Sequence, residues 1–484
     1  MAHLIYPTID LFLYDLRDGL GQEQKEIDKN RQHFAQKLPA SIHSSLFEHD
    51  TPFEAEYIEL LGNPRTVDLT LPSPNFEGYY YPVRLSDTYA LLLDCSVKNQ
   101  ITHPVSCIAT LKKLIDQALK EQVANIGQTW MISGELPSNA YPIDNPESIA
   151  QACYQALIPD ASWEDNLQGK GYFLGATIFE LWRDSKVISD PYSSPSPEPL
   201  SLTTIKDNHH IIIAIYPNQE TADKAADFIP EWLRLFCYRS KILWAYRQSR
   251  LLKQSLKTDF IKIQQYIKGF KTDKYKKQSL KHIEQILDEA ETIFSNYVID
   301  LNYLEFQSST IDTNLYNYRQ LLVEMQNNST IEVMPTDLKF LKKFYRSGRD
   351  KYLQQVQKDY DSLSPGLKLL EVSVNFIRAE VALNQAKRDR TFQNTIAIIG
   401  VGLAAGSFIA SIAGQFPGAG DTKPAEALKY PVGSTLSYLG VPNPWLVPTT
   451  SIVISLGVAI AAGAFTALVI QLSWLAKKLR SRSR

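Results

Sequence analysis

Small and hydroxyl-bearing side chains interrupt an apolar stretch near the end of the chain. Of the patterns in the sequence, this one is the best candidate for binding or passing an ion. Such side chains leave width between packed helices and offer oxygen atoms to a hydrated ion. The candidates for lining an ion path are Asn394, Thr395, Gly402, Ser407 and Ser411. The residues at the mouth of that path would be Gly414, Gln415 and Phe416. If this stretch lines a path, the pattern predicts the passage of an ion rather than a covalent step. Close packing of helices is the alternative explanation of the small residues.

The sequence contains none of the common catalytic or cofactor-binding motifs. A Gly-rich phosphate loop, a GxSxG turn and an HExxH helix are all missing. The four cysteines show no CxxC spacing, which argues against a zinc knuckle or a redox pair. His209 and His210 stand at the start of a predicted strand, where such a pair is more often structural than metal-binding. We therefore predict that the protein is not an enzyme and has no resident cofactor, with a divalent cation expected only as cargo or regulator.

Two long uncharged runs predict a membrane hairpin. Residues 395–412 and 451–475 carry no charged side chain, and each run is long enough to cross the hydrocarbon core. Lysine and arginine flank both ends of the hairpin, which predicts a multi-pass protein of the inner or plasma membrane with both termini in the cytoplasm. A buried core helix is the alternative for each run. The expected elements are a transmembrane helix at 394–414, an extracytoplasmic loop at 415–449, a second transmembrane helix at 450–475 and a basic cytoplasmic tail at 476–484.

Residues 363–393 have the spacing of a coiled-coil stalk that leads into the first span. The apolar residues alternate at intervals of four and three, which is the a/d pattern of a helix seam, and the seam ends in polar residues. Pro365 is expected at the start of one helix that runs from about 365 to 413. The seam either self-associates around a symmetry axis or packs against the chain's own domain. Its residues are Leu363, Leu367, Leu370, Val374, Ile377, Val381, Asn384 and Arg388.

The chain before the stalk divides into an acidic first part and a helical second part. Residues 1–230 contain 31 acidic and 16 basic residues, which argues against nucleic-acid binding there. We expect this part to be a cytoplasmic α/β domain, and residues 231–362 to form a long-helix domain with helices at 231–270, 280–298, 313–326 and 337–363. The strands expected in the first part lie at 89–97, 129–134, 172–182 and 210–216, with helices at 104–122 and 146–156. The predicted fold class is thus an α+β or α/β cytoplasmic domain followed by long helices, a coiled-coil stalk and two C-terminal transmembrane helices.

This order of parts resembles the CorA family of divalent-metal channels. The resemblance rests on the seam from Leu363 to Val381, the span that begins at Asn394 and the basic tail. It implies a homopentameric funnel in which the first span lines the pore and acidic sites in the soluble domain sense the metal. The family's signature Gly-Met-Asn is replaced here by Gly414-Gln415-Phe416.

Three functions are compatible with these patterns. The first is a CorA-like oligomeric membrane channel or transporter for a cation, with a regulatory cytoplasmic domain. The second is a membrane-anchored signalling or defence effector whose cytoplasmic domain binds a small ligand or partner and changes the state of the hairpin. The third is a membrane tether with a coiled-coil scaffold. The expected partners are the membrane, further copies of the chain and a small regulatory ligand.

Overall fold

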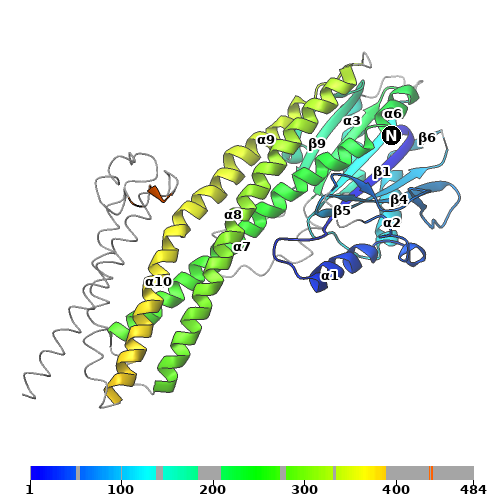
Figure 1. Ribbon diagram of the computed structural model, residues 1–484. Coiled ribbons are helices and arrows are strands. Elements are labelled where there is room, and N and C mark those ends of the chain that lie inside the picture. The colour runs from blue at the N-terminus through cyan, green and yellow to red at the C-terminus, as the bar shows by residue number, and fades with distance from the viewer. Residues whose placement is uncertain are drawn as a thin grey trace, which may run out of the picture. The chain divides into compact units, whose positions relative to one another are not determined.

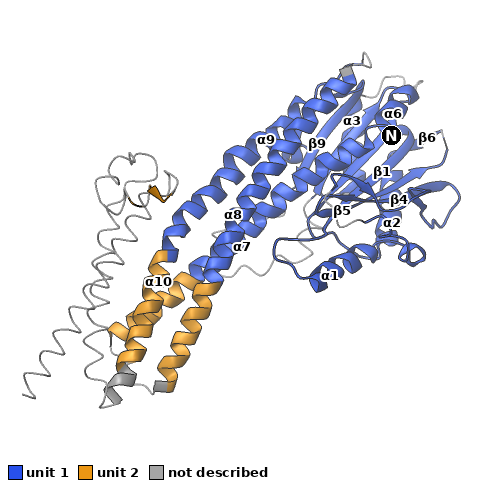
Figure 2. Ribbon diagram, viewed as in Figure 1, with its two compact units in different colours: residues 1–258, 296–367 blue, residues 259–295, 368–484 orange. Residues whose placement is uncertain are grey.

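The computed structural model describes residues 2–50, 55–99, 101–137, 145–183, 209–272, 280–330, 334–388, 435 and 438–439 (Figure 1). The chain separates into two compact units (Figure 2). Unit 1 comprises Met1–Thr258 and Asn296–Leu367, and unit 2 comprises Asp259–Ser295 and Lys368–Arg484. The domain boundaries expected at residues 230 and 362 stay predictions.

Unit 1 is built on a mixed ten-stranded sheet within the described residues. Its main order is β2-β4-β5-β1-β7-β10-β9-β8, with β3 paired to β4 and β6 paired to β1. The pairing of β7 with β10 is parallel, and the other pairs are antiparallel. The strands are β1 (His3–Leu16), β2 (Ile58–Glu59), β3 (Val67–Asp68), β4 (Phe76–Leu85), β5 (Thr88–Val97), β6 (Thr102–Pro104), β7 (Gly127–Glu135), β8 (Leu167–Phe173), β9 (Ala176–Arg183) and β10 (His209–Tyr216).

The helices fall into a short set beside the sheet and a long set. The short helices are α1 (Gln24–Ala35), α2 (Cys107–Leu119), α3 (Pro146–Leu157), α4 (Trp163–Asn166) and α6 (Gln219–Ala226). The long set contains α7 (Ile229–Lys271), α8 (Leu280–Thr330), α9 (Lys342–Ser347) and α10 (Gln354–Arg388). Short 3-10 turns at Ala40–Ile42 and Lys339–Leu341 and a π-helical segment at Gly348–Leu353 complete the elements. The π-helical segment joins α9 directly to α10.

Alternation along the strands gives the sheet two different faces. One face is apolar and forms a core with buried residues of α1, α2 and α3. The opposite face packs against α7, where the ring centroids of Phe12 and Phe236 lie 5.1 Å apart. On the same face the Tyr14 hydroxyl donates to the Leu233 carbonyl oxygen over 2.9 Å. This second face also carries polar side chains, and it positions the candidate site.

Most of the strands expected from the sequence are confirmed, and one is wrong. The expected strands at 89–97, 129–134 and 210–216 correspond to β5, β7 and β10, and the expected helices at 104–122 and 146–156 correspond to α2 and α3. The single strand expected at 172–182 is instead the hairpin of β8 and β9. Leu174 and Gly175 adopt φ values of 49° and 85°, which close a tight turn that splits the apolar run.

The long helices also differ from their expected bounds. The two helices expected at 280–298 and 313–326 are one continuous helix, α8. Pro365 was expected at a helix start, but it lies inside α10. Proline in a helix interior removes one backbone donor and destabilises the helix, so packing around Pro365 must offset this cost. Close by, the Tyr297 hydroxyl donates to the Leu363 carbonyl oxygen over 2.8 Å, which ties this stretch of α10 to α8.

The expected membrane spans are not found in the described part of the chain. No helix there combines the length and the apolar composition that a membrane crossing requires. The long helices carry charged side chains along them, such as Arg234 and Arg250 of α7. The predicted fold class with two transmembrane helices and the predicted multi-pass location in the inner or plasma membrane are therefore wrong on this finding. The ranges 394–414 and 450–475 lie outside the described residues.

The predicted stalk seam is largely buried within a single chain. Leu370, Val374, Ile377 and Val381 of unit 2 are between 0 and 5% exposed. Leu363 and Leu367, which belong to unit 1, are half-buried, and Asn384 and Arg388 lie in α10 with side chains outside the description. In unit 2 the Phe270 and Phe376 rings lie 6.4 Å apart, and Arg378 Nη2 lies 2.7 Å from Glu291 Oε1. These contacts favour packing of the seam against the chain's own helices.

Candidate functional site: a buried arginine beside a small cavity

Three neighbouring strands bring a hydroxyl, an imidazole and a carboxylate into one hydrogen-bonded chain. Thr129 of β7 and His210 of β10 are register partners, and Thr129 Oγ1 lies 2.9 Å from His210 Nδ1. His210 Nε2 lies 3.3 Å from Oε1 of Glu180 on β9. All three side chains are buried. The His210 ring packs edge-on against Phe236, which places this chain on the face covered by α7.

Burial and a nearby cation keep His210 neutral. Burial lowers the pKa of His210 to about 4, and the positive charge of Arg239 acts in the same direction. The hydrogen bond with Glu180 and its charge oppose this shift without cancelling it. Near neutral pH the imidazole therefore holds a single ring proton and links its two neighbours.

Arg239 of α7 is a buried charged side chain in this region. Its residue is 2% exposed, and its guanidinium carbon lies 4.9 Å from the Trp182 ring centroid and 4.1 Å from that of Phe344. These aromatic contacts hold the cation in place without using its N–H groups. Nε and Nη1 have no hydrogen-bond partner within the described structure. A buried guanidinium is always charged, and its donors are normally paired, so these two donors call for an acceptor.

A small cavity lies beside these groups. Its volume is about 30 Å³, which is room for roughly two water molecules. The cavity is lined by the start of β7, one side of α7 and single residues of β9 and β10. The lining residues are Ile126, Gly127, Gln128, Thr129, Trp182, His210, Arg239, Ser240, Leu243 and Arg247.

Gly127 allows β7 and α7 to approach closely at this point. A Cβ atom at position 127 would lie 2.9 Å from both Cβ and Oγ of Ser240, which is closer than side chains normally pack. The missing side chain therefore lets the helix lie against the strand end. As a result, Ser240 and Arg239 reach the same cavity as Thr129.

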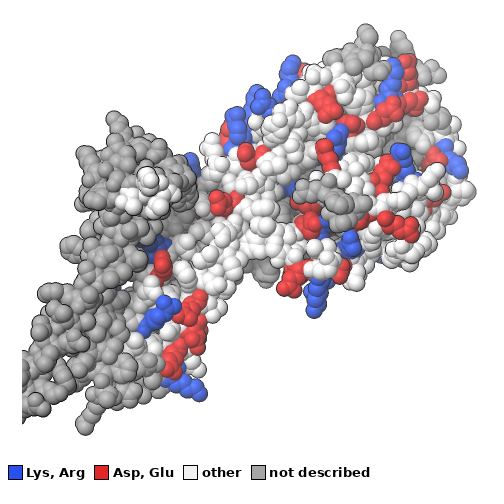
Figure 3. Space-filling view, in the orientation of Figure 1, with Lys and Arg blue, Asp and Glu red and all other residues white. Residues whose placement is uncertain are grey.

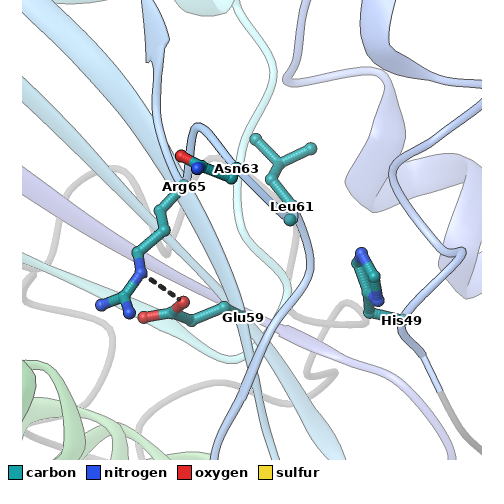
Figure 4. Close-up of a pocket in the computed structure, with 6 residues that line it drawn as sticks. His49, Glu59, Leu61, Asn63 and Arg65 are labelled. Carbon is teal, nitrogen blue, oxygen red and sulfur yellow. Dashed lines mark ion pairs between the residues drawn. The ribbon is translucent and has the colours of Figure 1, made fainter.

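A larger but more open pocket lies where Glu59 of β2 meets the neighbouring loop residues (Figure 4). Its volume is about 490 Å³, and it is lined by His49, Glu59, Leu61, Gly62, Asn63 and Arg65. Figure 4 shows Arg65 directed at Glu59, with 2.9 Å between Nε and Oε2. The Tyr81 hydroxyl also donates to Glu59 over 3.0 Å, so both oxygens of this carboxylate have partners. Because its charged groups are already paired, this pocket makes a weaker case for a ligand.

The charged surface and the acidic residues do not point to another site. On the face drawn in Figure 3, acidic and basic side chains are interspersed over the described residues. Within the described ranges, no group of three or more His, Cys, Asp or Glu side chains is placed to hold a metal ion. The small cavity beside the buried Arg239 is therefore the best candidate.

None of the site residues predicted from the sequence belongs to this site, and His210 was noted only as part of a histidine pair expected to be structural. The pore-lining candidates and the pore-mouth residues lie in the undescribed range 389–434. Thr129 and Glu180 fell inside predicted strands, and Arg239 inside a predicted helix, but none was recognised as functional. The available signal was a polar residue within an otherwise apolar strand, which indicates a buried polar contact.

Comparisons of the chain with models of protein families, with curated proteins and with solved structures found no match. The resemblance to CorA channels accordingly stays a prediction from the sequence.

Proposed function

We propose that this protein is a regulatory binding protein whose unit 1 takes up a small oxyanion in the cavity beside Arg239. The observation that carries this proposal is the buried guanidinium with two donors that have no partner in the described structure. An oxyanion would accept hydrogen bonds from these donors and balance their charge. Of the three functions compatible with the sequence, the effector that binds a small ligand is the most similar to this proposal.

The energetic argument rests on the cost of an unsatisfied buried donor. Leaving a polar group unpaired in the interior costs about 1–3 kcal/mol, and more when the group is charged. A ligand that pairs the two Arg239 donors recovers this cost, whereas the chain alone does not. Charge-assisted hydrogen bonds to an anion are also shorter and stronger than neutral ones. The cavity volume of about 30 Å³ favours an anion of a few atoms over a nucleotide.

The position of Arg239 suits a regulatory role. It lies on α7, a helix of 43 residues that contributes to unit 1 and, beyond Thr258, to unit 2. A ligand that binds only one arrangement of α7 would stabilise that arrangement by its difference in affinity. The binding event and the state of the long helix would then be coupled.

Thermal unfolding of the full chain tests this proposal. Formate, nitrate, bicarbonate and phosphate are added in turn at constant ionic strength, and the midpoint temperature is recorded. We expect at least one oxyanion to raise it, because a ligand at 100 times its Kd stabilises the folded state by about 2.7 kcal/mol. Arg239→Met keeps the side-chain stem between the two aromatic rings but removes the donors, so this variant should fold and lose the response.

Arg234→Met is the matched control. Arg234 lies on the same helix, pairs with Glu231 over 3.2 Å and is 20% exposed in its side chain, so its loss should leave the response intact. The proposal is wrong if no oxyanion shifts the midpoint, or if Arg239→Met responds like the wild type.

The cation-channel function and the homopentamer implied by the CorA resemblance stay predictions, and no described residue tests them.

A further inference from the structure

One face of α8 carries a long stripe of exposed residues that have no charge. The residues recur at intervals of three and four, as the a and d positions of a coiled-coil seam do. Four of them are large aliphatic or aromatic side chains that are between 37 and 63% exposed. We call this set the outer stripe, and its members are Ile299, Asn302, Phe306, Ser309, Thr313, Tyr316, Gln320 and Val323.

The opposite face of α8 is already packed within unit 1. Leu304, Ile311 and Leu315 are between 0 and 2% exposed. The Tyr318 hydroxyl donates to the Leu341 carbonyl oxygen over 3.3 Å. These contacts attach the helix to its own unit without the outer stripe. The stripe, which runs roughly 36 Å at 1.5 Å per residue, is therefore a second surface of the same helix.

The outer stripe has the same chemical order in both directions. From either end of the stripe the side chains are aliphatic, amide, aromatic and hydroxyl in turn. An antiparallel coiled coil sets the a positions of one helix against the d positions of the other. A second α8 in that arrangement would place like against like, with Ile299 on Val323, Asn302 on Gln320, Phe306 on Tyr316 and Ser309 on Thr313.

These layers are chemically matched. The aliphatic and aromatic pairs bury apolar surface, and amide and hydroxyl groups can each donate to and accept from their counterparts. A parallel pair of helices would set every residue against its own copy whatever the sequence. The reversed match is therefore a property of this stripe, and it favours the antiparallel direction.

The charged side of the stripe fits the same arrangement. Glu305 lies beside Tyr360 of α10, and the Arg319 guanidinium carbon lies 5.9 Å from the Tyr345 ring centroid of α9. Both residues therefore lie on the side of the stripe toward α9 and α10. In the antiparallel pair this side meets its own copy, so Glu305 of each chain lies opposite Arg319 of the other. Asp312, midway between them, approaches its own copy near the symmetry axis, so two attractive pairs oppose one repulsive contact.

We propose that the outer stripe is the contact surface of a two-fold homodimer in which α8 of one copy packs antiparallel on α8 of a second copy. A two-fold contact needs a surface that is complementary to itself, and the outer stripe is so in its side-chain types and in its charges. This contact is separate from the cavity at Arg239 and from the stalk seam. The homopentamer implied by the CorA resemblance would instead use two different surfaces of each copy.

Sedimentation of the full chain over a series of concentrations tests the contact. We expect a monomer–dimer equilibrium in the wild type. Tyr316→Glu places a charge opposite Phe306 of the second copy and should leave the chain monomeric over the same series. Leu369→Glu is the matched control, because Leu369 is 59% exposed, Tyr316 is 63% exposed and only Tyr316 belongs to the stripe. This control should associate like the wild type.

Charge reversal tests the antiparallel direction. Glu305→Lys would face Arg319 of the second copy twice by symmetry, and it should raise the Kd of the dimer about tenfold. Adding Arg319→Glu to the same chain restores opposite charges and should return the Kd to within about threefold of the wild type. Asp312→Asn removes the repulsive contact at the axis and should lower the Kd.

The outcomes decide the proposal in either direction. A wild type that stays monomeric at every concentration would overturn it, and so would association that Tyr316→Glu leaves unchanged. Failure of Arg319→Glu to restore the dimer of Glu305→Lys would overturn the antiparallel arrangement. Circular dichroism of Tyr316→Glu should match the wild type, because the side chain is exposed. If it does not, the charge-reversal pair decides.

Discussion

Asp10 and Asp94 stand directly opposite each other on β1 and β5, and they share the buried face of the sheet that lies toward α7. Burial raises the pKa of Asp10 to about 7, although a hydrogen bond with Asp94 opposes the rise. Burial likewise raises the pKa of Asp94, and the charges of Asp10 and Glu77 add to this. Two like charges at this distance resist simultaneous ionisation, so the pair holds a proton that separate carboxyls would release.

The proton on this pair predicts a stability that declines with rising pH. The unfolded chain releases the Asp10 proton near its ordinary pKa of about 4, while the folded chain keeps it up to about pH 7. The free energy of unfolding from this group is therefore highest below about pH 4 and falls as the pH rises through about 7. Asp10→Asn cannot ionise, so its urea unfolding should depend less on pH over this range. The exposed Asp160→Asn should keep the wild-type profile, and an unchanged profile in Asp10→Asn would contradict the assignment.

Asp50 shows the opposite way of burying a carboxylate. Its side chain is 0% exposed and accepts a hydrogen bond from Tyr89 over 2.7 Å. Arg17, Arg31 and Arg84 lie 3.3, 3.2 and 2.9 Å from its oxygens. Burial alone would raise the pKa of Asp50, but the Tyr89 hydrogen bond and the three guanidinium charges together hold it below its usual range. These partners keep the carboxylate ionised, and they come from several elements of unit 1.

At the scale of elements, the contact between β7 and α7 decides whether the candidate site exists. The strand supplies Thr129 and the helix supplies Arg239 and Ser240, so both must approach closely. Gly127 permits this approach, because any added Cβ would collide with Ser240. The spacing of the two elements is thus set by one residue without a side chain.

Gly127→Ala should lower the free energy of unfolding by about 1–3 kcal/mol, which is the usual cost of overpacking a buried contact. Adding Ser240→Gly should recover most of this loss, since the nearest remaining Ser240 atom would be Cα at 3.6 Å. Ser240→Ala keeps the colliding Cβ and should not recover it. Chemical denaturation of the three variants checks the contact. Equal recovery by Ser240→Gly and Ser240→Ala would contradict a close contact between position 127 and the Ser240 side chain.

At the scale of the whole molecule, the stalk seam connects the fold to the question of oligomerisation. Its spacing is equally suited to a coiled coil between copies and to packing within one chain. Leu370 and Ile377 are 1 and 0% exposed in the single chain, whereas Leu369 on the same helix is 59% exposed. The seam therefore has an intramolecular partner before any second copy is considered.

Ile377→Ala should lower the free energy of unfolding by about 2–5 kcal/mol, because it leaves a cavity among buried side chains. Leu369→Ala removes an exposed side chain on the same helix and should change it by about 0.5 kcal/mol or less. Mass measurement of both variants in solution should give the wild-type value. A changed mass with unchanged stability in Ile377→Ala would instead assign the seam to an interface between copies.

The sequence alone was sufficient for elements whose periodicity is strong and local. Helix α7 and strands β5, β7 and β10 were predicted because apolar side chains recur at one spacing and turn residues bound them. Strand β1 was not predicted, since Asp10 and Asp15 interrupt its apolar pattern. Asp15 is acceptable there because Lys37 of the segment after α1 lies 3.2 Å from its carboxylate.

The expected membrane spans rest on the composition of C-terminal runs that lie outside the described residues. Their apolar composition predicted membrane spans, while the described helices contain none that is long and apolar enough. Composition records only how apolar a segment is, and the same composition suits a span or a buried helix.

The candidate site was decided by tertiary structure. His210 attracted notice as part of a histidine pair, but its partners come from β7, β9 and α7. Sheet register sets Thr129 beside His210, and helix packing brings Arg239 to them. Hydrogen bonds and charges act through space over a few ångströms, so their partners follow from the register and packing of distant segments. Element type is a local property that the chain's own periodicity determines, whereas the chemistry of this site arises only when four elements meet.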